Sequence, residues 1–305
     1  MDRLTLESLR AFVVFADTLN FTHAAERLCL SQPALHVKIQ ELSRGLGLPL
    51  YVRRGRRLEL TSKGEELARF AREMDDRVAG FVADFHERVG QRPVVLAAGE
   101  GAYLYLLGPA LRTYLQSSQV PLQLLTTRGD ETLEAVRSGK AHLGVGSFLE
   151  LPVELSAHPL RQIQQVLVLP RGHRLARRKH LRLADLEGLR LIVPPPGRPQ
   201  RQMLSERLDQ AGVKWSVAVE ASGWELMLHF VQLGLGAAVV NSFCAVPPGC
   251  VARPIEDLDS IFYSVVLSSG YIRPEANRLL EEILRAGRAF STAKTERCED
   301  SVGGR

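Results

Sequence analysis

The chain has 305 residues, of which 45% are hydrophobic and 24% charged, so it can form a small domain and a larger one, each with an apolar core. Its formal net charge of +5 is too common among soluble proteins to identify an anionic partner. Acidic residues interrupt the N-terminal apolar residues, and no later run approaches the roughly 18 apolar residues that a membrane span needs. These features speak against a signal peptide and a membrane anchor, and we expect a cytoplasmic protein.

The N-terminal part of the sequence predicts three short helices. Apolar residues recur at helical spacing over residues 5–18, and Thr22 is the expected cap of a short second helix. Ser31 is a favourable N-cap for the third helix, and Pro33 is tolerated in its first turn, where the missing N–H is not needed. The buried stripe of the third helix consists of Leu35, Ile39, Leu42 and Leu46.

The outward face of the third helix has the chemistry of a surface that reads DNA. A helix–turn–helix protein inserts its second helix into the major groove, where glutamine pairs with adenine and a small apolar group meets the thymine methyl. A packed helical hairpin with a solvated face is the alternative. The residues that we predict to contact DNA from these helices are Thr22, Ser31, Gln32, Pro33, His36, Val37, Lys38 and Gln40.

The next segment, LPLYVRRGRRLELTSKG, predicts a two-stranded hairpin with its turn at Gly55. Such a hairpin beside a recognition helix is a wing, and arginine suits the narrow, negative minor groove or its phosphates. A solvated run of charges is the alternative. The wing residues that we predict to contact DNA are Arg53, Arg54, Arg56 and Arg57.

A dense set of residues in this part of the chain matches a known family. They are Leu9, Phe12, Phe21-Thr22, Ala24-Ala25, Leu28, Ser31-Gln32-Pro33-Ala34-Leu35, Ile39, Leu42, Leu46-Gly47, Leu50, Arg53, Arg57, Leu60-Thr61 and Gly64. In this pattern the chain resembles the LysR-type transcriptional regulators, which implies a winged helix–turn–helix domain over residues 1–61. His36, Val37 and Lys38 depart from the family where it usually has serine, then often arginine and glutamine. The base preference of known family members therefore cannot be carried over to this chain.

Residues 62–90 predict one long helix, because good helix formers continue without proline from Lys63 to about Val89. Its apolar stripe repeats at coiled-coil spacing and consists of Leu67, Phe70, Met74, Val78, Phe81 and Phe85. Packing of this helix on its own downstream domain is the alternative. The resemblance implies a linker helix that joins two chains into a homodimer, and dimers that pair into a homotetramer over a long, bent promoter site.

Residues 91–290 predict an α/β domain, since apolar strands alternate with helices in a βαβ order that indicates parallel sheets. The resemblance implies a two-lobed effector-binding domain similar to periplasmic solute-binding proteins. One lobe is expected from residues 91–160 plus 267–290 and the other from residues 161–266. The hinge is expected near residues 160–165 and 262–266, and residues 291–305 are expected to form a disordered tail.

Ligands of parallel sheets bind beyond the carboxyl ends of the strands, often at helix N-termini. We expect three arginines to clamp a carboxylate or phosphate there, with Tyr103 and Trp224 as an apolar wall. The sequence therefore predicts a small, anionic effector and neither a cofactor nor a metal. The predicted contact residues are Gly101, Ala102, Tyr103, Thr127, Arg128, Ser147, Pro196, Arg198, Arg201 and Trp224.

Motifs of enzymes are incomplete. Gly99-Glu100-Gly101 lacks the third glycine of a dinucleotide fingerprint, and Ser147 lacks the following glycine of a nucleophile elbow. His173 and His180 have no accompanying acidic cluster that would complete a metal site. We therefore predict that the chain is not an enzyme but a regulator that binds double-stranded promoter DNA, responds to an effector and acts on RNA polymerase. A cytoplasmic solute-binding module is the alternative.

Cys244 and Cys250 raise a further alternative, a redox sensor, because the intervening Pro-Pro-Gly turn would allow a disulfide. Against it, Cys244 continues an apolar run and no basic residue between the two stabilises a thiolate. The family's redox members carry their cysteine pair on the stretch that corresponds to residues 200–208, where this chain has no cysteine. We predict that both cysteines are structural.

Overall fold

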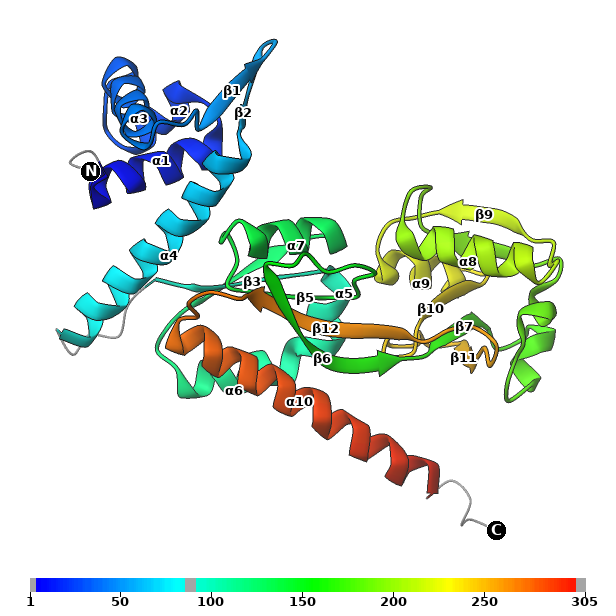
Figure 1. Ribbon diagram of the computed structural model, residues 1–305. Coiled ribbons are helices and arrows are strands. Elements are labelled where there is room, and N and C mark those ends of the chain that lie inside the picture. The colour runs from blue at the N-terminus through cyan, green and yellow to red at the C-terminus, as the bar shows by residue number, and fades with distance from the viewer. Residues whose placement is uncertain (1–3, 86–91, 300–305) are drawn as a thin grey trace.

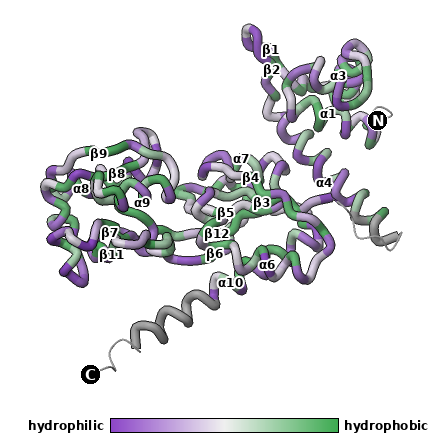
Figure 2. Tube along the Cα trace, turned by 180° about the vertical axis from the view of Figure 1, so that it is seen from behind, coloured by the Kyte–Doolittle hydropathy of each residue, from purple (hydrophilic) through white to green (hydrophobic). Residues whose placement is uncertain are grey.

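A small helical unit, one long helix and a two-lobed α/β domain follow one another in the computed structural model, which describes residues 4–85 and 92–299 (Figure 1). Hydrophobic residues concentrate in the strands of the two lobes, whereas the tip of the N-terminal hairpin is hydrophilic (Figure 2). No helix in the described ranges has the length and apolar composition needed to cross a bilayer.

The N-terminal unit contains the three predicted helices and the hairpin. Asn20 caps the second helix, since its Oδ1 accepts hydrogen bonds from the backbone N–H groups of Thr22 at 2.9 Å and His23 at 3.2 Å. The prediction that Thr22 is the cap is therefore wrong, because the helix begins at Phe21, two residues earlier than a Thr22 cap requires. The elements are α1 (Leu6–Thr18), α2 (Phe21–Arg27), α3 (Gln32–Leu46), β1 (Tyr51–Arg54) and β2 (Arg57–Leu60).

The core of this unit is formed by all three helices. Phe12, Phe15, Leu35 and Ile39 are fully buried in it, as the helical spacing predicts. Buried alanines on α2 and α4 allow close approach between helices. Leu46 was expected in the same stripe but is 37% exposed, because it is the last residue of α3.

The long helix α4 (Ser62–Phe85) starts directly after the hairpin. Its Gly64 lies against the Leu50 carbonyl, and Ala68 and Ala71 are buried. The predicted continuation to residue 90 lies outside the described residues after Phe85.

Lobe I is a five-stranded mixed sheet with helices on its faces (Figure 1). Strand β3 is parallel to β4 and β5, as the βαβ order predicts, and β12 is antiparallel to β5 and β6. The strands are β3 (Val94–Ala98), β4 (Leu122–Thr126), β5 (Leu143–Gly146), β6 (Leu155–Ile163) and β12 (Ile261–Ser268). The helices are α5 (Glu100–Ala102), the π-helical turn Tyr103–Leu107, α6 (Gly108–Ser117), α7 (Gly129–Arg137) and α10 (Pro274–Glu299).

Lobe II combines the sheet β10–β7–β11 with the parallel pair β8–β9, and a bridge between Leu191 and Ala237 joins them. The expectation of parallel strands is wrong for β7, which is antiparallel to β10 and β11. Strand β7 follows β6 without the helical crossover that parallel neighbours require. The elements are β7 (Gln165–Pro170), two 3-10 turns (Arg174–Arg177 and Leu183–Leu186), β8 (Arg190–Val193), α8 (Pro199–Gln210), β9 (Ser216–Glu220), α9 (Trp224–Gln232), β10 (Ala238–Asn241) and β11 (Cys250–Pro254).

Two connections cross between the lobes. One is at Gln164, between β6 and β7, and the other is formed by residues 255–260. The expectation of a crossing at residues 262–266 is wrong, because these residues belong to β12 and pair along β6. The expectation of a disordered tail is wrong for residues 291–299, which continue α10 without a proline or glycine to end the helix. Residues 300–305 lie outside the described part of the chain.

Candidate DNA interface and effector cleft

The outward side of α3 carries a mixed polar and apolar surface. Gln32 and Pro33 are exposed in its first turn, and Val37 is 53% exposed one turn later. The His36 ring packs edge-on against Phe21, with 5.0 Å between the ring centroids. Gln40 accepts a hydrogen bond of 3.4 Å from the guanidinium of Arg44, four residues on. The N-terminal half of α3 thus presents an amide and an apolar group at its surface, which are the groups that base edges require.

Lys38 is the one member of the predicted set on α3 that faces α1. Its ammonium lies 2.6 Å from the Glu7 carboxylate, and this hydrogen bond and charge lower the pKa of Glu7. Lys38 lies beside the buried Ile39 and three residues after the buried Leu35, so the helical period turns it toward α1. We correct its assignment accordingly, from a DNA contact to an ion pair between helices.

The four wing arginines are all exposed, at or beside the turn between β1 and β2. Gly55 makes this turn with a φ of 62°, and the backbones of Arg54 and Arg57 lie opposite each other across it. The Arg54 guanidinium lies 3.2 Å from the Glu59 carboxylate, while the Arg53 Nε donates to the Gly55 carbonyl at 3.2 Å. The wing thus presents a basic tip in which the charge of Arg54 is partly compensated.

This geometry separates two kinds of DNA contact. We expect Arg57→Ala to weaken binding to all sequences alike and to reduce the slope of log Kd against log salt by about 0.9, because one phosphate contact is lost. Gln40→Ala should instead relax preference at one base pair by about 1–3 kcal/mol. Fluorescence anisotropy with an operator and its single-base variants measures both effects. Arg54→Ala is the control with a smaller effect, and equal loss of specificity from Gln40→Ala and Arg57→Ala would contradict the division.

A cleft of about 800 Å³ lies between the two lobes, at the carboxyl ends of strands β3, β4, β5 and β8. This is the place where parallel sheets bind ligands. The loops after these strands and the start of α9, which follows β9, bring together seven of the ten residues predicted for effector binding. The seven are Gly101, Ala102, Thr127, Arg128, Ser147, Arg198 and Trp224.

The other three predicted residues do not line this cleft. Tyr103 donates from its hydroxyl to the carbonyls of Leu96 at 2.7 Å and Leu125 at 3.0 Å, so it points into lobe I, where burial raises its pKa to about 12. The Arg201 guanidinium stacks over the Trp215 ring, 4.5 Å from the ring centroid. Pro196 is exposed and is absent from the lining. These three expectations were wrong, because spacing along a loop or helix does not fix the direction of a side chain.

The expected anion clamp is also weaker than the sequence suggests. Arg128 holds Glu131 through its Nε at 2.9 Å and its Nη2 at 2.8 Å, and its backbone N–H donates to the same carboxylate at 3.0 Å. The hydrogen bonds from Arg128 lower the pKa of Glu131, and the charge of Arg198 adds to this effect. The positive charge of Arg128 is therefore largely compensated, and Arg201 lies elsewhere. Of the three arginines predicted to clamp an anion, Arg198 is therefore the one left to bind it.

Several lining residues were not found from the sequence. Asn241 could have been found as the polar residue that ends the apolar run GAAVVN, whereas Tyr263 lies on a strand assigned to the hinge. The remaining lining residues are mainly on α8, α9 and the lobe I loops, where no motif marks them. The missed residues include Glu131, Thr132, Leu149, Met203, Met227, Asn241, Ile261 and Tyr263.

Contacts between the lobes close one side of the cleft. The Trp224 ring packs so tightly on Gly101 that a Cβ there would lie 2.6 Å from the Trp224 Cδ1. The Tyr105 hydroxyl donates to the Glu225 carboxylate. Both contacts join lobe I to the N-terminal turn of α9, so the separation of the lobes depends on them.

Two family models match the chain. Residues 6–65 match a bacterial regulatory helix-turn-helix protein model of the lysR family, and residues 87–288 match the LysR substrate binding domain. The chain belongs to the LysR family. It is therefore a LysR-type DNA-binding transcriptional regulator with a substrate-binding domain, and the fold class predicted from the sequence is confirmed.

Known proteins with similar chains agree with this family. The probable RuBisCO transcriptional regulator of Guillardia theta is 29% identical over 249 residues, which cover 78% of this chain and 79% of that protein. Full-length OxyR from Pseudomonas aeruginosa has a TM-score of 0.73 at 21% identity and covers 93% of this chain and 95% of its own. CbnR complexed with its target DNA has a TM-score of 0.56 at 22% identity, and the match covers 93% of this chain and 100% of that one. At these identities the two solved structures show the fold of this LysR-type regulator.

Cys244 and Cys250 of this LysR-type regulator are both free and buried. Burial raises the pKa of Cys244 to about 12 and also raises the pKa of Cys250. Both side chains belong to the apolar cluster between α9 and the sheet of lobe II. Protonated, buried thiols react slowly with oxidants.

We expect Cys244→Ser and Cys250→Ser to leave DNA binding unchanged before and after treatment with mild peroxide, because neither thiol forms a thiolate near neutral pH. Electrophoretic mobility shifts with and without peroxide measure this. Cys29→Ser, at the exposed cysteine, is the matched control. A peroxide-dependent change in the parent protein that disappears in Cys250→Ser would establish the redox alternative.

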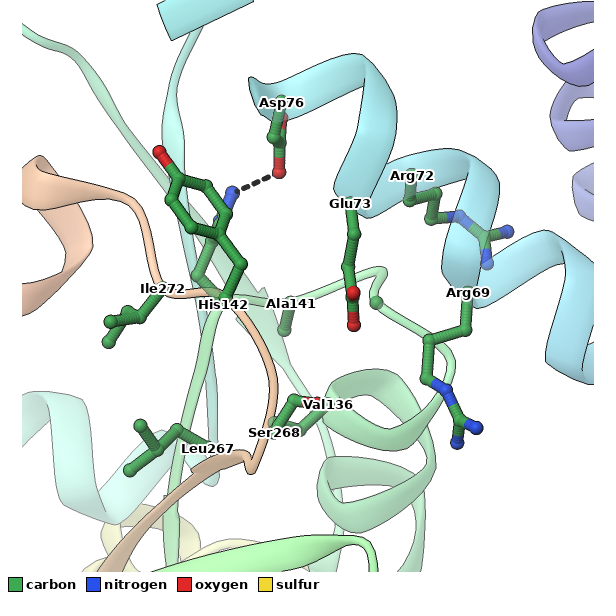
Figure 3. Close-up of a pocket in the computed structure, with 12 residues that line it drawn as sticks. Arg69, Arg72, Glu73, Asp76, Val136, Ala141, His142, Leu267, Ser268 and Ile272 are labelled. Atoms are coloured by element: carbon green, nitrogen blue, oxygen red, sulfur yellow. Dashed lines mark hydrogen bonds and ion pairs between the residues drawn. The ribbon is translucent and has the colours of Figure 1, made fainter. Parts of the chain in front are cut away.

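The long helix α4 contacts lobe I through charged side chains (Figure 3). Arg69, Arg72, Glu73 and Asp76 project from α4 over a hollow of about 40 Å³ whose floor is formed by lobe I. Arg72 also donates to the Ser138 carbonyl at the end of α7. The helix that follows the DNA-binding unit is thus held directly on the effector-binding domain.

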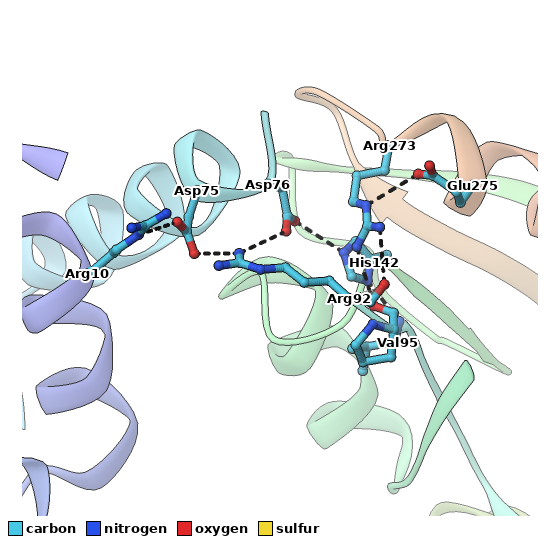
Figure 4. A network of polar contacts seen from close by, with 9 residues as sticks. Arg10, Asp75, Asp76, Arg92, Val95, His142, Arg273 and Glu275 are labelled. Atoms are coloured by element: carbon cyan, nitrogen blue, oxygen red, sulfur yellow. Dashed lines mark hydrogen bonds and ion pairs between the residues drawn. The ribbon is translucent and has the colours of Figure 1, made fainter. Parts of the chain in front are cut away.

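A chain of polar contacts joins α1 to strand β3 across this junction (Figure 4). The distances are 2.6 Å from Arg10 to Asp75, 2.5 Å from Asp75 to Arg92, 4.0 Å from Arg92 to Asp76 and 3.2 Å from Asp76 to His142. The His142 Nδ1 accepts from the Val95 backbone N–H at 2.9 Å, so its Nε2 carries the proton and donates to Asp76. The residues in order are Arg10, Asp75, Arg92, Asp76 and His142.

Proposed function

We propose that this regulator couples a ligand in the cleft to the position of its recognition helix on promoter DNA. The observation that carries the proposal is that α7 and β5 each have one end at the cleft and the other at α4. Gly129 and Thr132 of α7 line the cleft, while Arg137 at its last turn lies 3.1 Å from Glu65 of α4. Strand β5 ends at the cleft, and His142 just before it is bonded to Asp76 of α4.

The mechanism follows from these two rigid connections. A ligand that binds the closed lobes better than the open ones shifts the population toward closure. Movement of α7 and β5 then changes the contacts with α4 and, through Asp17 of α1, which lies 2.5 Å from Arg72, the orientation of the DNA-binding unit. In a dimer joined through α4, and in a tetramer of two dimers, this changes the bend of the promoter and access by RNA polymerase.

Two features support DNA as the partner. The wing and α3 together present arginines and hydrogen-bonding side chains at one surface, and CbnR, which shares the fold, has been solved in complex with its target DNA. Because chromosomal DNA lies in the cytoplasm of bacteria, we propose that compartment. Genome-wide mapping of bound DNA would identify the operator and the neighbouring genes.

The coupling is tested by its reciprocity, since DNA must alter the cleft if the cleft alters DNA binding. The chain has two tryptophans, so Trp215→Phe leaves Trp224 of the cleft as the single reporter. We expect operator DNA to change Trp224 emission, and Glu65→Gln to reduce that change while DNA still binds. Arg285→Gln, which removes an ion pair on α10, is the control.

An unchanged Trp224 emission at saturating operator DNA would refute the coupling. An equal change in the Glu65→Gln and parent proteins would show that α7 does not carry it. Anisotropy of the labelled operator in the same cuvette reports binding, so loss of DNA affinity is not mistaken for loss of coupling.

A further inference from the structure

The charges that line the cleft cancel. Arg128 and Arg198 are opposed by Glu100 and Glu131, and Arg128 is already bound to Glu131. The Glu100 carboxylate lies toward Gly223, at the N-terminus of α9. Among the described residues that line this cleft, a ligand with two negative charges would meet two carboxylates and one cation, Arg198, that is not held in such a pair. A single carboxylate fits this balance, placed at Arg198 and the N-terminus of α8.

The floor of the cleft holds an unmet hydrogen-bond acceptor. Asn241 is 1% exposed, and its Nδ2 donates to the Tyr263 hydroxyl at 3.1 Å. Its Oδ1 has no hydrogen-bond partner within the described part of the chain, although Asn241 lines the cleft. A buried amide oxygen without a partner is costly, and a donor brought by a ligand would relieve that cost.

Apolar side chains also line the cleft. Met203 of α8 and Met227 of α9 come from lobe II, and the Trp224 ring closes the side toward Gly101. Ile261 adds an aliphatic surface at the start of β12. Methionines and a tryptophan together suit a flat or compact apolar body.

We propose, building on the function proposed above, that the ligand is a small monocarboxylate with an apolar body and a hydroxyl at the far end. The carboxylate binds Arg198 and the N-terminus of α8, the body packs on Trp224 and the two methionines, and the hydroxyl donates to the Asn241 Oδ1. Dianions such as dicarboxylates and phosphate esters are excluded by Glu100 and Glu131.

Three probes test this by isothermal titration calorimetry on the full chain. 4-Hydroxyphenylacetate has all three features, phenylacetate lacks the hydroxyl, and 4-carboxyphenylacetate replaces it with a second carboxylate. We expect 4-hydroxyphenylacetate to bind roughly three- to tenfold more tightly than phenylacetate, because one neutral hydrogen bond is gained. 4-Carboxyphenylacetate should bind at least about tenfold more weakly than 4-hydroxyphenylacetate, since its second charge meets an acceptor and no cation.

Three variants assign these effects to residues. Asn241→Leu, which is similar in size, should remove the preference for the hydroxyl, so that 4-hydroxyphenylacetate and phenylacetate bind with the same affinity. Arg198→Gln should weaken both monocarboxylates by roughly tenfold or more, because a charged hydrogen bond is lost. Arg201→Gln is the matched control on the same helix, and it should change neither affinity because Arg201 stacks on Trp215 outside the cleft.

Several results would overturn the proposal. These are a hydroxyl preference that survives Asn241→Leu, equal losses in Arg198→Gln and Arg201→Gln, tighter binding of 4-carboxyphenylacetate, or no binding of either monocarboxylate at millimolar concentration. The change in Trp224 emission on adding operator DNA needs no ligand. If the change in emission persists while these probes do not bind, the proposed ligand class is wrong. The proposed coupling of the cleft to DNA binding then still stands.

Discussion

Gly64→Ala is expected to unfold the DNA-binding unit while the effector-binding domain stays folded. A Cβ at this position would lie 1.9 Å from the carbonyl oxygen of Leu50, which is backbone and cannot rotate away. That oxygen accepts the backbone N–H of Thr61 at 3.1 Å and so joins the start of the wing to the start of α4. Relief of the clash must separate these elements, at a cost of about 3 kcal/mol or more. A unit of this size has little stability beyond that.

Hydrogen exchange resolved by peptide measures the effect in the full chain. Peptides from α1 to β2 should lose protection, those from lobes I and II should keep it, and operator binding should disappear. Gly108→Ala is the control, because a Cβ there has nothing within 4 Å and alanine is favourable in a helix. Unchanged protection in the DNA-binding unit of Gly64→Ala would contradict the expected clash.

The order of elements and most buried residues could be predicted because they depend on local spacing. The stripe of α3, the hairpin turn at Gly55 and the strands after Val94 all follow from patterns within a few residues. The seven residues of the cleft that were predicted lie in loops after parallel strands, where topology alone brings them together.

The remaining features depend on contacts between distant residues. Tyr103 is drawn into lobe I by the carbonyls of Leu96 and Leu125, and Arg128 is neutralised by a glutamate one turn later. Neither the direction of a side chain nor the pairing of one charge with another follows from periodicity. The individual contacts of α4 with lobe I were also not predicted, because charged residues on a helix usually face solvent.

The three sides of α4 bear on how two chains associate. Ala68 and Ala71 are buried in the chain, and Arg72 and Asp76 face lobe I. The predicted apolar stripe forms the third side. Phe70 on this side is 44% exposed and Phe81 is 70% exposed, while the side chain of Phe85 lies outside the described part. The alternative that α4 packs on its own domain thus describes its charged side, and Leu67 at the start of the stripe packs against the core of the DNA-binding unit. Association of two chains through the rest of the stripe stays a prediction.

Val78→Asp is expected to dissociate the dimer that we propose to form through α4. Val78 is half-buried within the stripe, between Met74 and Phe81, so a second chain packed there would enclose the new carboxylate without a partner. Removing an unpaired charge from water costs several kcal/mol, which raises the dissociation constant of the dimer by at least about a hundredfold. Sedimentation equilibrium measures the constant, and Val78→Ile, which keeps the stripe apolar, is the control. A Val78→Asp protein that remains dimeric at nanomolar concentration would show that the stripe does not form the interface. If instead the dimer is lost and circular dichroism is unchanged, α4 joins the two chains, and loss of cooperative operator binding should accompany the loss of the dimer.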